Sequence, residues 1–352
     1  MKILFVVTGF GYGDSVRTDA IIDEIKKLNP KSKFLILGYS KSYAYFSKKY
    51  HTLEVEGYNF PDKDMKFSAS KFLLRNFYLP KKWFNNFKKH KTIIEDFNPD
   101  IVVSDFEPLG IIIARKLGIK CISIFGFDPL TYKDYPNKKG ILSLQSTYIS
   151  RVYHESDLVI IPSFKKQKAH SNIIYVNPIV RDYKPKNKTK IMKSLRLNEH
   201  PILVMLGGSN YGISLAKKIK EANQELNQEL IIFGGNKQIP HLHFVTFKYD
   251  FLDYLNVCSG VITLGGNLTL SECLEFKKPA LIFPIKHHVE QLMNAHTLRD
   301  TFYVETDLRK VKESMKNFVK NKNRIVAKLA KSKLKFNGAE QAAKIILKEA
   351  KL

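Results

Sequence analysis

Short apolar segments rich in Ile, Val, Leu and Phe alternate along most of the chain with longer segments of helical character. Strands of this uniformly apolar kind are typical of a parallel sheet that helices cover on both faces. The alternation therefore predicts an α/β fold assembled from βα units. Strands are expected near residues 3–7, 33–37, 101–104, 120–125, 158–161, 173–176, 202–206, 230–233, 244–247, 260–264 and 280–283. Helices are expected near residues 17–28, 71–97, 109–117, 140–154, 213–225, 251–258, 268–276 and 289–300.

The length of 352 residues exceeds the size at which one hydrophobic core keeps growing, so two domains are expected. Residues 177–188 contain two prolines and many polar residues without periodicity, which is typical of a linker. We expect an N-terminal domain over residues 1–178, a hinge over residues 179–190 and a C-terminal domain over residues 191–335. Residues 336–352 are expected to form a last helix.

Three cysteines, Cys121, Cys258 and Cys273, lie in apolar segments and lack the spacing of a zinc site. They are expected to be reduced core residues of a cytoplasmic protein. The apolar run after Lys2 is shorter than the core of a signal peptide. No apolar run approaches the roughly 18 residues of a transmembrane helix, so no membrane span is expected.

The formal net charge of +25 favours association with anions, such as nucleic acid, anionic lipid or phosphorylated substrates. Lysine is scattered with Asn and Ile throughout the chain, so a bias of composition is an equally good explanation. Residues 309–335 concentrate the charge, with eleven Lys or Arg and one Glu. Because no recognition motif accompanies this segment, binding to nucleic acid is the least favoured interpretation.

A first glycine turn, residues 8–14, follows the first expected strand and precedes a helix. Glycines here allow a sharp bend and a close approach of the backbone to a ligand, beside the N–H groups of a helix start. Gly11 and Gly13 are the candidate ligand contacts. The second strand ends at residues 37–39 without the acidic residue of a dinucleotide site, which argues against dinucleotide binding. A purely structural turn is the alternative.

A second glycine turn, residues 265–269, predicts a diphosphate site more specifically. An apolar strand ends in two glycines, Asn267 can cap, and a helix begins. The N–H groups of this helix start and its dipole would attract an anion. Glu272 lies one helical turn further on, where its carboxylate could accept hydrogen bonds from a ribose. A solvated helix residue is the alternative for Glu272.

A polar loop follows the next expected strand and leads into a helix at Glu290 and Gln291. A carboxylate beside a carboxamide suits the hydroxyl groups of a sugar, which need both acceptors and donors. His287 and His288 in the same loop could indicate a metal site. No third ligand lies at a plausible spacing, so no metal is expected.

These residues resemble the donor-site signature of the GT-B glycosyltransferases. The motif runs from Gly265-Gly266-x-x-Thr269-x-x-Glu272 through Pro279-x-x-x-x-Pro284 to Glu290-Gln291-x-x-Asn294-Ala295. The chain looks most similar to a branch like glycosyltransferase family 28. That branch is related to the N-acetylglucosaminyltransferase that makes the lipid precursor of peptidoglycan, with uncharacterised archaeal and bacterial relatives. Supporting motifs extend the resemblance over nearly the whole chain: Leu206-Gly207-Gly208-Ser209, Asn177-Pro178-Ile179-Val180-Arg181 and Ser104-Asp105-Phe106-Glu107-Pro108.

The resemblance implies two Rossmann-like parallel-sheet domains that face each other across a cleft. The C-terminal domain would hold a nucleotide sugar, with UDP as the default nucleotide, and the N-terminal domain would hold the acceptor. The last helix would pack back on the N-terminal domain. The residues implied for the donor are Gly265, Gly266, Asn267, Leu268 and Thr269 for the diphosphate, Glu272 for the ribose, Glu290 and Gln291 for the sugar, and Phe247, Lys248 and Tyr249 for the base. Gly207, Gly208 and Ser209 are also implied to bind the nucleotide sugar.

The first glycine turn departs from the pattern of such relatives, which commonly carry Gly-His-x-x-Arg there. This chain has Gly13-Asp14-Ser15-Val16-Arg17, so Asp14 occupies the position of the His. A carboxylate can act as the base if burial or a nearby phosphate raises its pKa. Asp14 is the first candidate base, and Glu107 and Asp105 are the alternates. Arg17 is expected either to reach a phosphate or to lie on the helix surface.

The predicted reaction is direct displacement at the anomeric carbon by an acceptor hydroxyl, without a metal or other cofactor. Residues 71–84 combine aromatics, Leu and cations with the only tryptophan, as a surface at a membrane interface would. A lipid-phosphate acceptor at an anionic membrane is therefore one hypothesis, and ordinary core aromatics are the other. A nucleotide-sugar 2-epimerase of the same fold is the alternative activity.

Overall fold

The computed structural model describes residues 1–60, 65–128, 135, 140–184, 186–207, 212–234, 244–245 and 250–351. Contacts divide the chain into two compact units. Unit 1 consists of Met1–Pro61, Ser68–Arg181 and Leu334–Leu352, and unit 2 consists of Asp62–Phe67 and Asp182–Lys333. The chain thus passes from one unit to the other four times.

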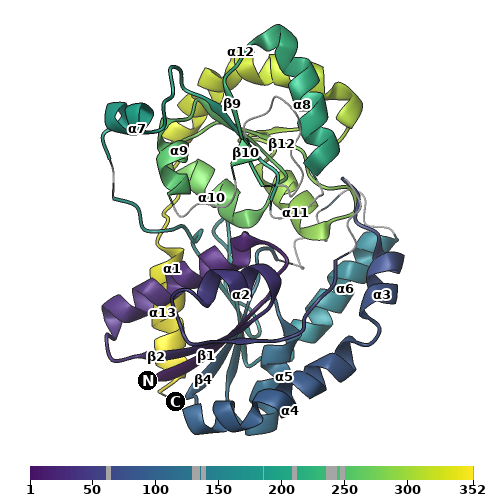
Figure 1. The fold of residues 1–352 in the computed structure, drawn as a ribbon, viewed down its shortest axis with the longest axis vertical. Coiled ribbons are helices and arrows are strands. Elements are labelled where there is room, and N and C mark those ends of the chain that lie inside the picture. Colours follow the sequence, from purple (N-terminus) through teal and green to yellow (C-terminus); the bar gives the residue numbers. More distant parts are fainter. Residues whose placement is uncertain are drawn as a thin grey trace. The chain divides into compact units, whose positions relative to one another are not determined.

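Unit 1 is built on a parallel seven-stranded sheet of order β3-β2-β1-β4-β5-β6-β7 (Figure 1). Its strands are β1 (Lys2–Val7), β2 (Lys33–Gly38), β3 (Thr52–Glu54), β4 (Ile101–Asp105), β5 (Cys121–Ile124), β6 (Leu158–Pro162) and β7 (Ile173–Val176). In the central register, Ile3 lies beside Phe34 on one side and Ile101 on the other. The strand order reverses between β1 and β4, so the carboxyl ends of these two strands form the switch point where open α/β sheets bind ligands.

The helices of unit 1 are α1 (Tyr12–Leu28), α2 (Ser40–Phe46), α3 (Ala69–Asn76), α4 (Leu79–Phe97), α5 (Pro108–Leu117), α6 (Ile141–Tyr153) and α13 (Gly338–Glu349). The C-terminal helix α13 lies beside α1 (Figure 1). A Cβ at Gly338 would lie only 1.8 Å from the carbonyl oxygen of Asn177, so glycine is required where α13 begins. Gln341 accepts a hydrogen bond from the backbone N–H of Asn177 at 2.7 Å and holds the helix there.

Unit 2 repeats the scheme with a parallel six-stranded sheet of order β10-β9-β8-β11-β12-β13. Its strands are β8 (Ile202–Met205), β9 (Leu230–Phe233), β10 (Phe244–Val245), β11 (Gly260–Thr263), β12 (Ala280–Ile282) and β13 (Tyr303–Val304). Its helices are α7 (Lys188–Ser194), α8 (Ile213–Leu226), α9 (Phe251–Val257), α10 (Asn267–Glu275), α11 (Val289–Leu298), the short η3 (Leu308–Lys310) and α12 (Val311–Ala330). The strand order reverses between β8 and β11, which places the switch point of this unit beside the second glycine turn.

The core of each unit lies between its sheet and the helices, as the apolar strands predict. All five residues of β4 and all four of β11 are buried. Cys121, Cys258 and Cys273 are buried free thiols, which confirms the expectation that they are core residues. No helix in the described part of the chain is long and apolar enough to cross a membrane.

The expectation of one helix over residues 71–97 is wrong, because the chain forms α3 and α4 there. Pro80 lies in the first turn of α4, where its missing N–H is tolerated, and a proline cannot continue a preceding helix. Residues 186–188 also differ from the expected linker. Asn187 caps α7 by accepting a hydrogen bond from the Lys190 N–H at 3.1 Å, so a helix begins within that segment.

The assignment of residues 65–67 to unit 2 was not expected from the sequence. These residues lie between β3 and α3 in sequence but belong to unit 2. Lys286 donates its backbone N–H to Met65 at 3.0 Å and accepts from the Phe67 N–H at 2.8 Å. The Phe67 ring meets the ring of His288 edge on, with centroids 6.2 Å apart. This short segment therefore packs on the loop that precedes α11.

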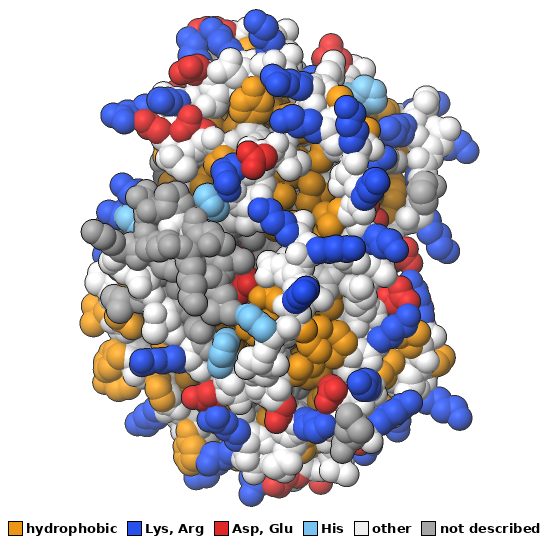
Figure 2. Space-filling model, turned by 180° about the vertical axis from the view of Figure 1, so that it is seen from behind, with side chains coloured by type: hydrophobic (Ala, Val, Ile, Leu, Met, Phe, Trp, Pro, Cys, Tyr) orange, Lys and Arg blue, Asp and Glu red, His pale blue; other side chains and the backbone are white. Residues whose placement is uncertain are grey.

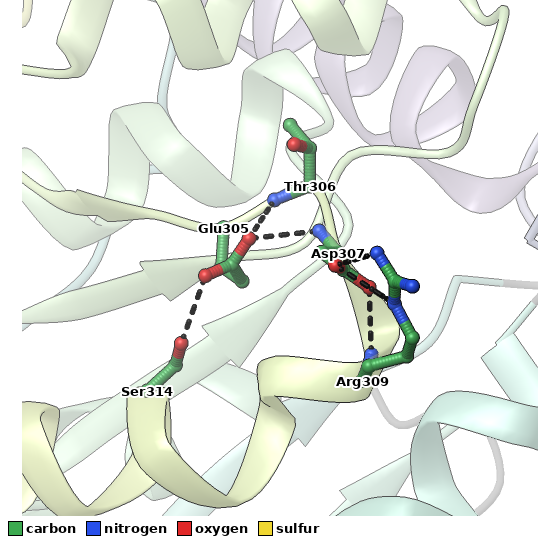
Figure 3. A network of polar contacts seen from close by, with 5 residues as sticks. All are labelled: Glu305, Thr306, Asp307, Arg309 and Ser314. Carbon is green, nitrogen blue, oxygen red and sulfur yellow. Dashed lines mark hydrogen bonds and ion pairs between the residues drawn. The ribbon is translucent and has the colours of Figure 1, made fainter.

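The basic helix α12 starts from a compact polar network (Figure 3). Glu305 accepts hydrogen bonds from the backbone N–H groups of Thr306 and Asp307, both at 2.8 Å, and from Ser314 at 3.2 Å. Asp307 pairs with Arg309, whose guanidinium lowers the pKa of that carboxyl to about 2.

Lys and Arg side chains are spread over the face seen in Figure 2 rather than gathered in one patch. The basic side chains of this face therefore do not form the single patch expected of a nucleic-acid surface.

Candidate functional site

The second glycine turn lies at the switch point of unit 2, directly after β11. Gly265 has φ of 95°, which L residues rarely adopt, and a Cβ there would approach Ile282 and the Gln291 carbonyl within 3.3 Å. The Asn294 side chain donates a hydrogen bond to the Gly265 carbonyl at 3.2 Å. Packing and hydrogen bonding thus fix the shape of the turn and leave no alternative to glycine at position 265.

The adjacent Gly266 has the opposite surroundings. It is the N-cap of α10 in an extended conformation, and a Cβ there would meet no atom within 4 Å. Asn267 is the first residue of the helix, so the expectation that Asn267 caps is wrong. A glycine N-cap has no side chain to satisfy the first N–H groups of the helix. Asn267, Leu268 and Thr269 form the first turn of α10, and the neighbouring Gly266 borders open space. A helix start beside open space has the geometry of an anion site.

Glu272 lies one turn further along α10 and is only 1% exposed, so the alternative of a solvated helix residue is wrong. Glu275 lies a further turn along the same helix. Burial raises the pKa of Glu275 to about 7, and the charges of Glu272 and Asp182 add to this effect. The end of α10 thus carries two carboxyl groups close together, of which sequence analysis had singled out only the first.

Gln291 and Glu290 occupy the first turn of α11. Gln291 is buried, and its side-chain oxygen accepts a hydrogen bond from the Ile285 N–H at 3.0 Å. Glu290 is half-buried. Burial lowers the pKa of His288 to about 4, so this histidine is a neutral core residue at physiological pH. Within the described residues, no group of three or more His, Cys, Asp or Glu side chains is placed to hold a metal ion.

The turn after β8 also reaches the switch point of unit 2. Gly207 has φ of 71°, and a Cβ there would meet no atom within 4 Å. The neighbouring turn after β9 approaches so closely that a Cβ on Gly234 would lie 1.9 Å from the Gly207 carbonyl oxygen. The other residues implied for the donor in these loops, Gly208, Ser209, Phe247, Lys248 and Tyr249, lie outside the described residues.

The first glycine turn occupies the switch point of unit 1, beside a network of buried charged side chains. The Thr8 N–H donates to the Asp105 carbonyl at 3.0 Å and joins the turn to the end of β4. The Asp105 carboxylate is fully buried and accepts from Arg17 Nε at 3.2 Å and Thr18 Oγ1 at 2.6 Å. The Arg17 Nη2 atom also pairs with Asp105 and, at 2.7 Å, with Asp14.

This network decides between the two expectations for Arg17. The residue is 3% exposed and lies between two carboxylates, so a position on the helix surface is wrong. The carboxylate of Asp14 is one quarter exposed and shares the guanidinium with Asp105. Gly11 and Gly13 border the same turn, and a Cβ on Gly13 would meet no atom within 4 Å. The ion pairs order the start of α1 and leave the glycine backbone open.

Glu107, the third candidate base, is the N-cap residue of α5 and is 1% exposed. Its Oε1 atom accepts a hydrogen bond from the Trp83 indole at 3.0 Å. Burial raises the pKa of the Glu107 carboxyl to about 8, although the nearby Tyr39 hydroxyl and the Trp83 indole lower it in part. The only tryptophan therefore faces the core of unit 1, which for this residue agrees with the alternative of ordinary core aromatics.

The comparisons with known proteins bear on this arrangement. The family described as Glycosyl transferase family 1 matches residues 1–322. The chain belongs to this family. An uncharacterised glycosyltransferase of Methanopyrus kandleri is 23% identical to this family 1 chain over 247 residues, which cover 66% of the chain and 70% of the relative.

Two further relatives agree with the family match. The UDP-N-acetylglucosamine–N-acetylmuramyl-(pentapeptide) pyrophosphoryl-undecaprenol N-acetylglucosamine transferase of Thermosipho africanus is 24% identical over 300 residues, covering 81% of this chain and 79% of the relative. The crystal structure of Acinetobacter baumannii MurG matches with a TM-score of 0.61 and 15% identity over 99% of both chains. The resemblance and the GT-B fold class expected from the sequence are thus confirmed. This family 1 protein is a glycosyl-transferring enzyme with two parallel-sheet α/β domains.

Proposed function

We propose that this glycosyltransferase moves a sugar from a nucleotide diphosphate, UDP in the first instance, to an acceptor hydroxyl or a lipid-linked phosphate acceptor. The observation that carries the proposal is the start of α10. Gly265 is held in a strained turn by packing, while Gly266 borders open space at a helix N-terminus. A diphosphate suits this place because its charge complements the helix dipole and the N–H groups.

The proposed chemistry is direct displacement at the anomeric carbon. As the bond to the diphosphate breaks, negative charge grows on the leaving oxygen, and preorganised N–H donors stabilise it. Asn267, Leu268 and Thr269 would supply these donors, while Glu272 would bind the ribose and the pair Glu290 and Gln291 the donor sugar. The proposal involves no resident metal or cofactor, because the helix start supplies positive potential at the leaving group.

The acceptor side of the proposal rests on an unusual surface of unit 1. Residues 68–94 contain seven Lys or Arg and no Asp or Glu. Helix α3 and the start of α4 expose five large apolar side chains by more than half: Leu73, Leu74, Phe77, Tyr78 and Phe84. Apolar side chains among cations suit the headgroup region of an anionic bilayer. The name of the Thermosipho africanus relative includes pyrophosphoryl-undecaprenol, which supports a lipid-linked acceptor here.

A thermal-shift screen with a panel of nucleotide sugars tests the donor part of the proposal. A ligand that binds only the folded protein raises the unfolding temperature by mass action. We expect selective stabilisation by one UDP-sugar and by UDP. A chain that no nucleotide sugar or nucleotide diphosphate stabilises would contradict the proposed donor.

Incubation with the donor alone separates glycosyl transfer from the epimerase alternative. A transferase should return the nucleotide sugar unchanged or slowly hydrolysed, whereas an epimerase should change the sugar configuration without an acceptor. Mass-matched chromatography of the recovered sugar distinguishes these outcomes. An epimerised sugar in the absence of acceptor would overturn the proposed transfer.

Cosedimentation with vesicles tests the membrane part. Vesicles that contain anionic phosphatidylglycerol should retain the protein at physiological salt, and purely zwitterionic vesicles should retain less. The double substitution Leu73→Glu with Leu74→Glu should release it, because both side chains are more than 60% exposed and the change places charge in the bilayer. The control Val326→Glu changes an exposed apolar residue of α12 and should not. Equal retention of all three proteins would contradict this surface.

A further inference from the structure

Three carboxyl groups lie near the carboxyl ends of β1 and β4, and their partners differ. Asp105 is bound by Arg17 and Thr18, and Asp14 is bound by Arg17. Glu107 is about as deeply buried as Asp105, yet among the described residues its Oε2 atom has no hydrogen-bond partner. A buried carboxyl oxygen without a donor is destabilising, so its presence calls for a role beyond packing.

The backbone around Glu107 is fixed without the help of this side chain. Phe106 has φ of 51° in the left-handed region, which is strained for a residue of this kind. The Glu107 carbonyl accepts from the Ser104 hydroxyl and, at 3.1 Å, from the Gly110 N–H. The carboxylate does not cap α5, although an acidic group at that position could do so. The backbone N–H of Leu109 in the first turn of α5 still lies close enough to the carboxylate to lower its pKa.

A chain of aromatic rings leads from Glu107 toward the surface of unit 1. The Trp83 ring that bonds Glu107 lies edge on to Tyr58, with centroids 5.9 Å apart. Tyr58 in turn contacts Phe72 at 5.5 Å and Phe60 at 5.9 Å, and Phe60 lies 3.8 Å from Phe10. Four of these rings, those of Phe10, Tyr58, Phe60 and Phe72, are half-buried. Half-exposed aromatic faces beside a buried polar group suit a ligand with apolar faces and hydroxyl groups, such as a sugar ring.

From this geometry we infer that Glu107 is the catalytic base of the proposed transfer and that the aromatic rings hold a hydroxyl-bearing acceptor, a sugar ring being the best fit. The inference rests on the proposed function. The acceptor O–H bond breaks and its proton passes to Glu107 Oε2. The acceptor oxygen forms the new bond to the anomeric carbon. The bond from that carbon to the diphosphate breaks, and the electron pair leaves with the nucleotide diphosphate.

The tyrosines around Glu107 do not titrate in the same pH range, so the titration of Glu107 can be followed by itself. The ionisable groups that face it are the hydroxyls of Tyr39 after β2, Tyr58 after β3 and Tyr153 in α6. Burial raises the pKa of each of these tyrosines well above 10, and the charge on Glu107 adds to the effect, so all three stay neutral below pH 9. A base at Glu107 should therefore give one rising limb of kcat/KM with pH, centred near pH 8.

The test is the release of UDP from the UDP-sugar that stabilises the protein most, with water as the acceptor. Glu107→Gln keeps the shape and can still accept from Trp83, so the fold and the donor Kd should be unchanged. Release should fall about 100-fold or more, and the rising limb should disappear. Glu107→Asp retains a carboxylate and should keep the limb at a reduced rate. The control Glu95→Gln changes an exposed carboxylate of α4 and should release UDP as the wild type does.

The outcomes separate this inference from the proposed function. If Glu107→Gln binds donor normally but releases UDP within about threefold of the wild-type rate, Glu107 is not the base. Loss of the rising limb in Asp14→Asn, with the limb kept in Glu107→Gln, would assign the proton to Asp14 instead. If Glu107→Gln does not fold, the limb in Glu107→Asp decides. A wild-type chain that binds no nucleotide sugar would overturn the proposed function itself.

Discussion

The two glycine turns lie at the switch points of two similar sheets, the first after β1 and the second after β11, and they differ in the charged side chains beside them. In unit 2, Gly266 begins α10 beside open space. In unit 1, Gly11 also begins α1 without a side-chain cap, but the buried pair of Arg17 and Asp105 lies beside that helix start. The helix start of the second turn therefore suits an anion, whereas the helix start of the first turn lies beside organised charged side chains.

This difference explains why a single fold can divide the work of a group transfer. In the proposed function, the donor would be held by its diphosphate, for which a helix start and its dipole suffice. The proposed acceptor is a hydroxyl group, which would need a positioned proton acceptor and a shaped apolar surface. The four predictions that follow compare the two turns in order of decreasing effect.

The largest effect is expected when Arg17, the cation beside the first turn, is replaced. Arg17→Met leaves the fully buried Asp105 without its partner and should lower the free energy of unfolding by about 3–5 kcal/mol. The matched control Arg115→Met removes an exposed ion pair with Glu155 and should lower it by less than about 1 kcal/mol. Urea unfolding measures both. Equal losses would show that the buried network is no more important than a surface pair.

Opposite pH dependences are expected from the two units. Glu107 binds its proton more tightly in the folded state, with a pKa near 8 against 4.5, so its contribution is lost as the pH rises from about 4.5 to 8. His288 binds its proton more weakly, with a pKa near 4 against 6.5, so stability is lost as the pH falls from about 6.5 to 4. At about 1.4 kcal/mol per pKa unit, the effect is on the order of 5 kcal/mol for Glu107 and on the order of 3–4 kcal/mol for His288.

Urea unfolding between pH 4 and 9 resolves the two effects. Glu107→Gln should flatten the alkaline decline, and His288→Gln should flatten the acid decline. A profile that neither substitution changes would mean that these two buried groups do not control the pH dependence.

Because the second turn borders open space, a larger side chain there should weaken ligand binding but leave the stability of the ligand-free protein nearly unchanged. Gly266→Val places a side chain where the structure has no atom within 4 Å, so the unfolding temperature should change little while the Kd for UDP rises about 100-fold. Gly11→Val is the matched change in the first turn, where a Cβ has a single neighbour at 4.0 Å. Its Kd for UDP should stay within twofold of the wild-type value. Similar losses in both variants would erase the distinction between the turns.

The smallest effect is expected at Glu272. Glu272→Ala removes the proposed ribose contact and should raise the donor KM several-fold, because one hydrogen-bonded carboxylate is lost. Glu275→Ala, one turn further along α10, is the control and should leave the donor KM nearly unchanged. Steady-state kinetics with varied donor measure both. An unchanged donor KM in Glu272→Ala would remove this residue from the site.

Sequence reasoning succeeded where one local property determines the structure. Apolar runs such as β1 are buried over nearly their whole length, and their shortness and their content of Ile, Val, Leu and Phe reveal them. Paired glycines between a strand and a helix likewise located the second turn. The strands β3 and β13 have only three and two residues, which is too short for a readable pattern.

Long-range relations were the part that the sequence could not supply. Trp83 and Glu107 are 24 residues apart, and their hydrogen bond depends on which face of α4 packs inward. The sequence pattern of an aromatic-rich amphipathic segment is the same whether its tryptophan faces lipid or the protein core. The placement of residues 65–67 in unit 2 depends on contacts with Lys286, more than 200 residues later. Both features reflect tertiary packing rather than local preference.

Hydrogen–deuterium exchange with and without UDP tests the central claim most directly, because it reports on both turns in one experiment. The account predicts that UDP slows exchange at residues 265–275, where α10 begins, and leaves residues 9–17 unchanged. Protection at residues 9–17 without protection at 265–275, or no protection anywhere at saturating UDP, would contradict it.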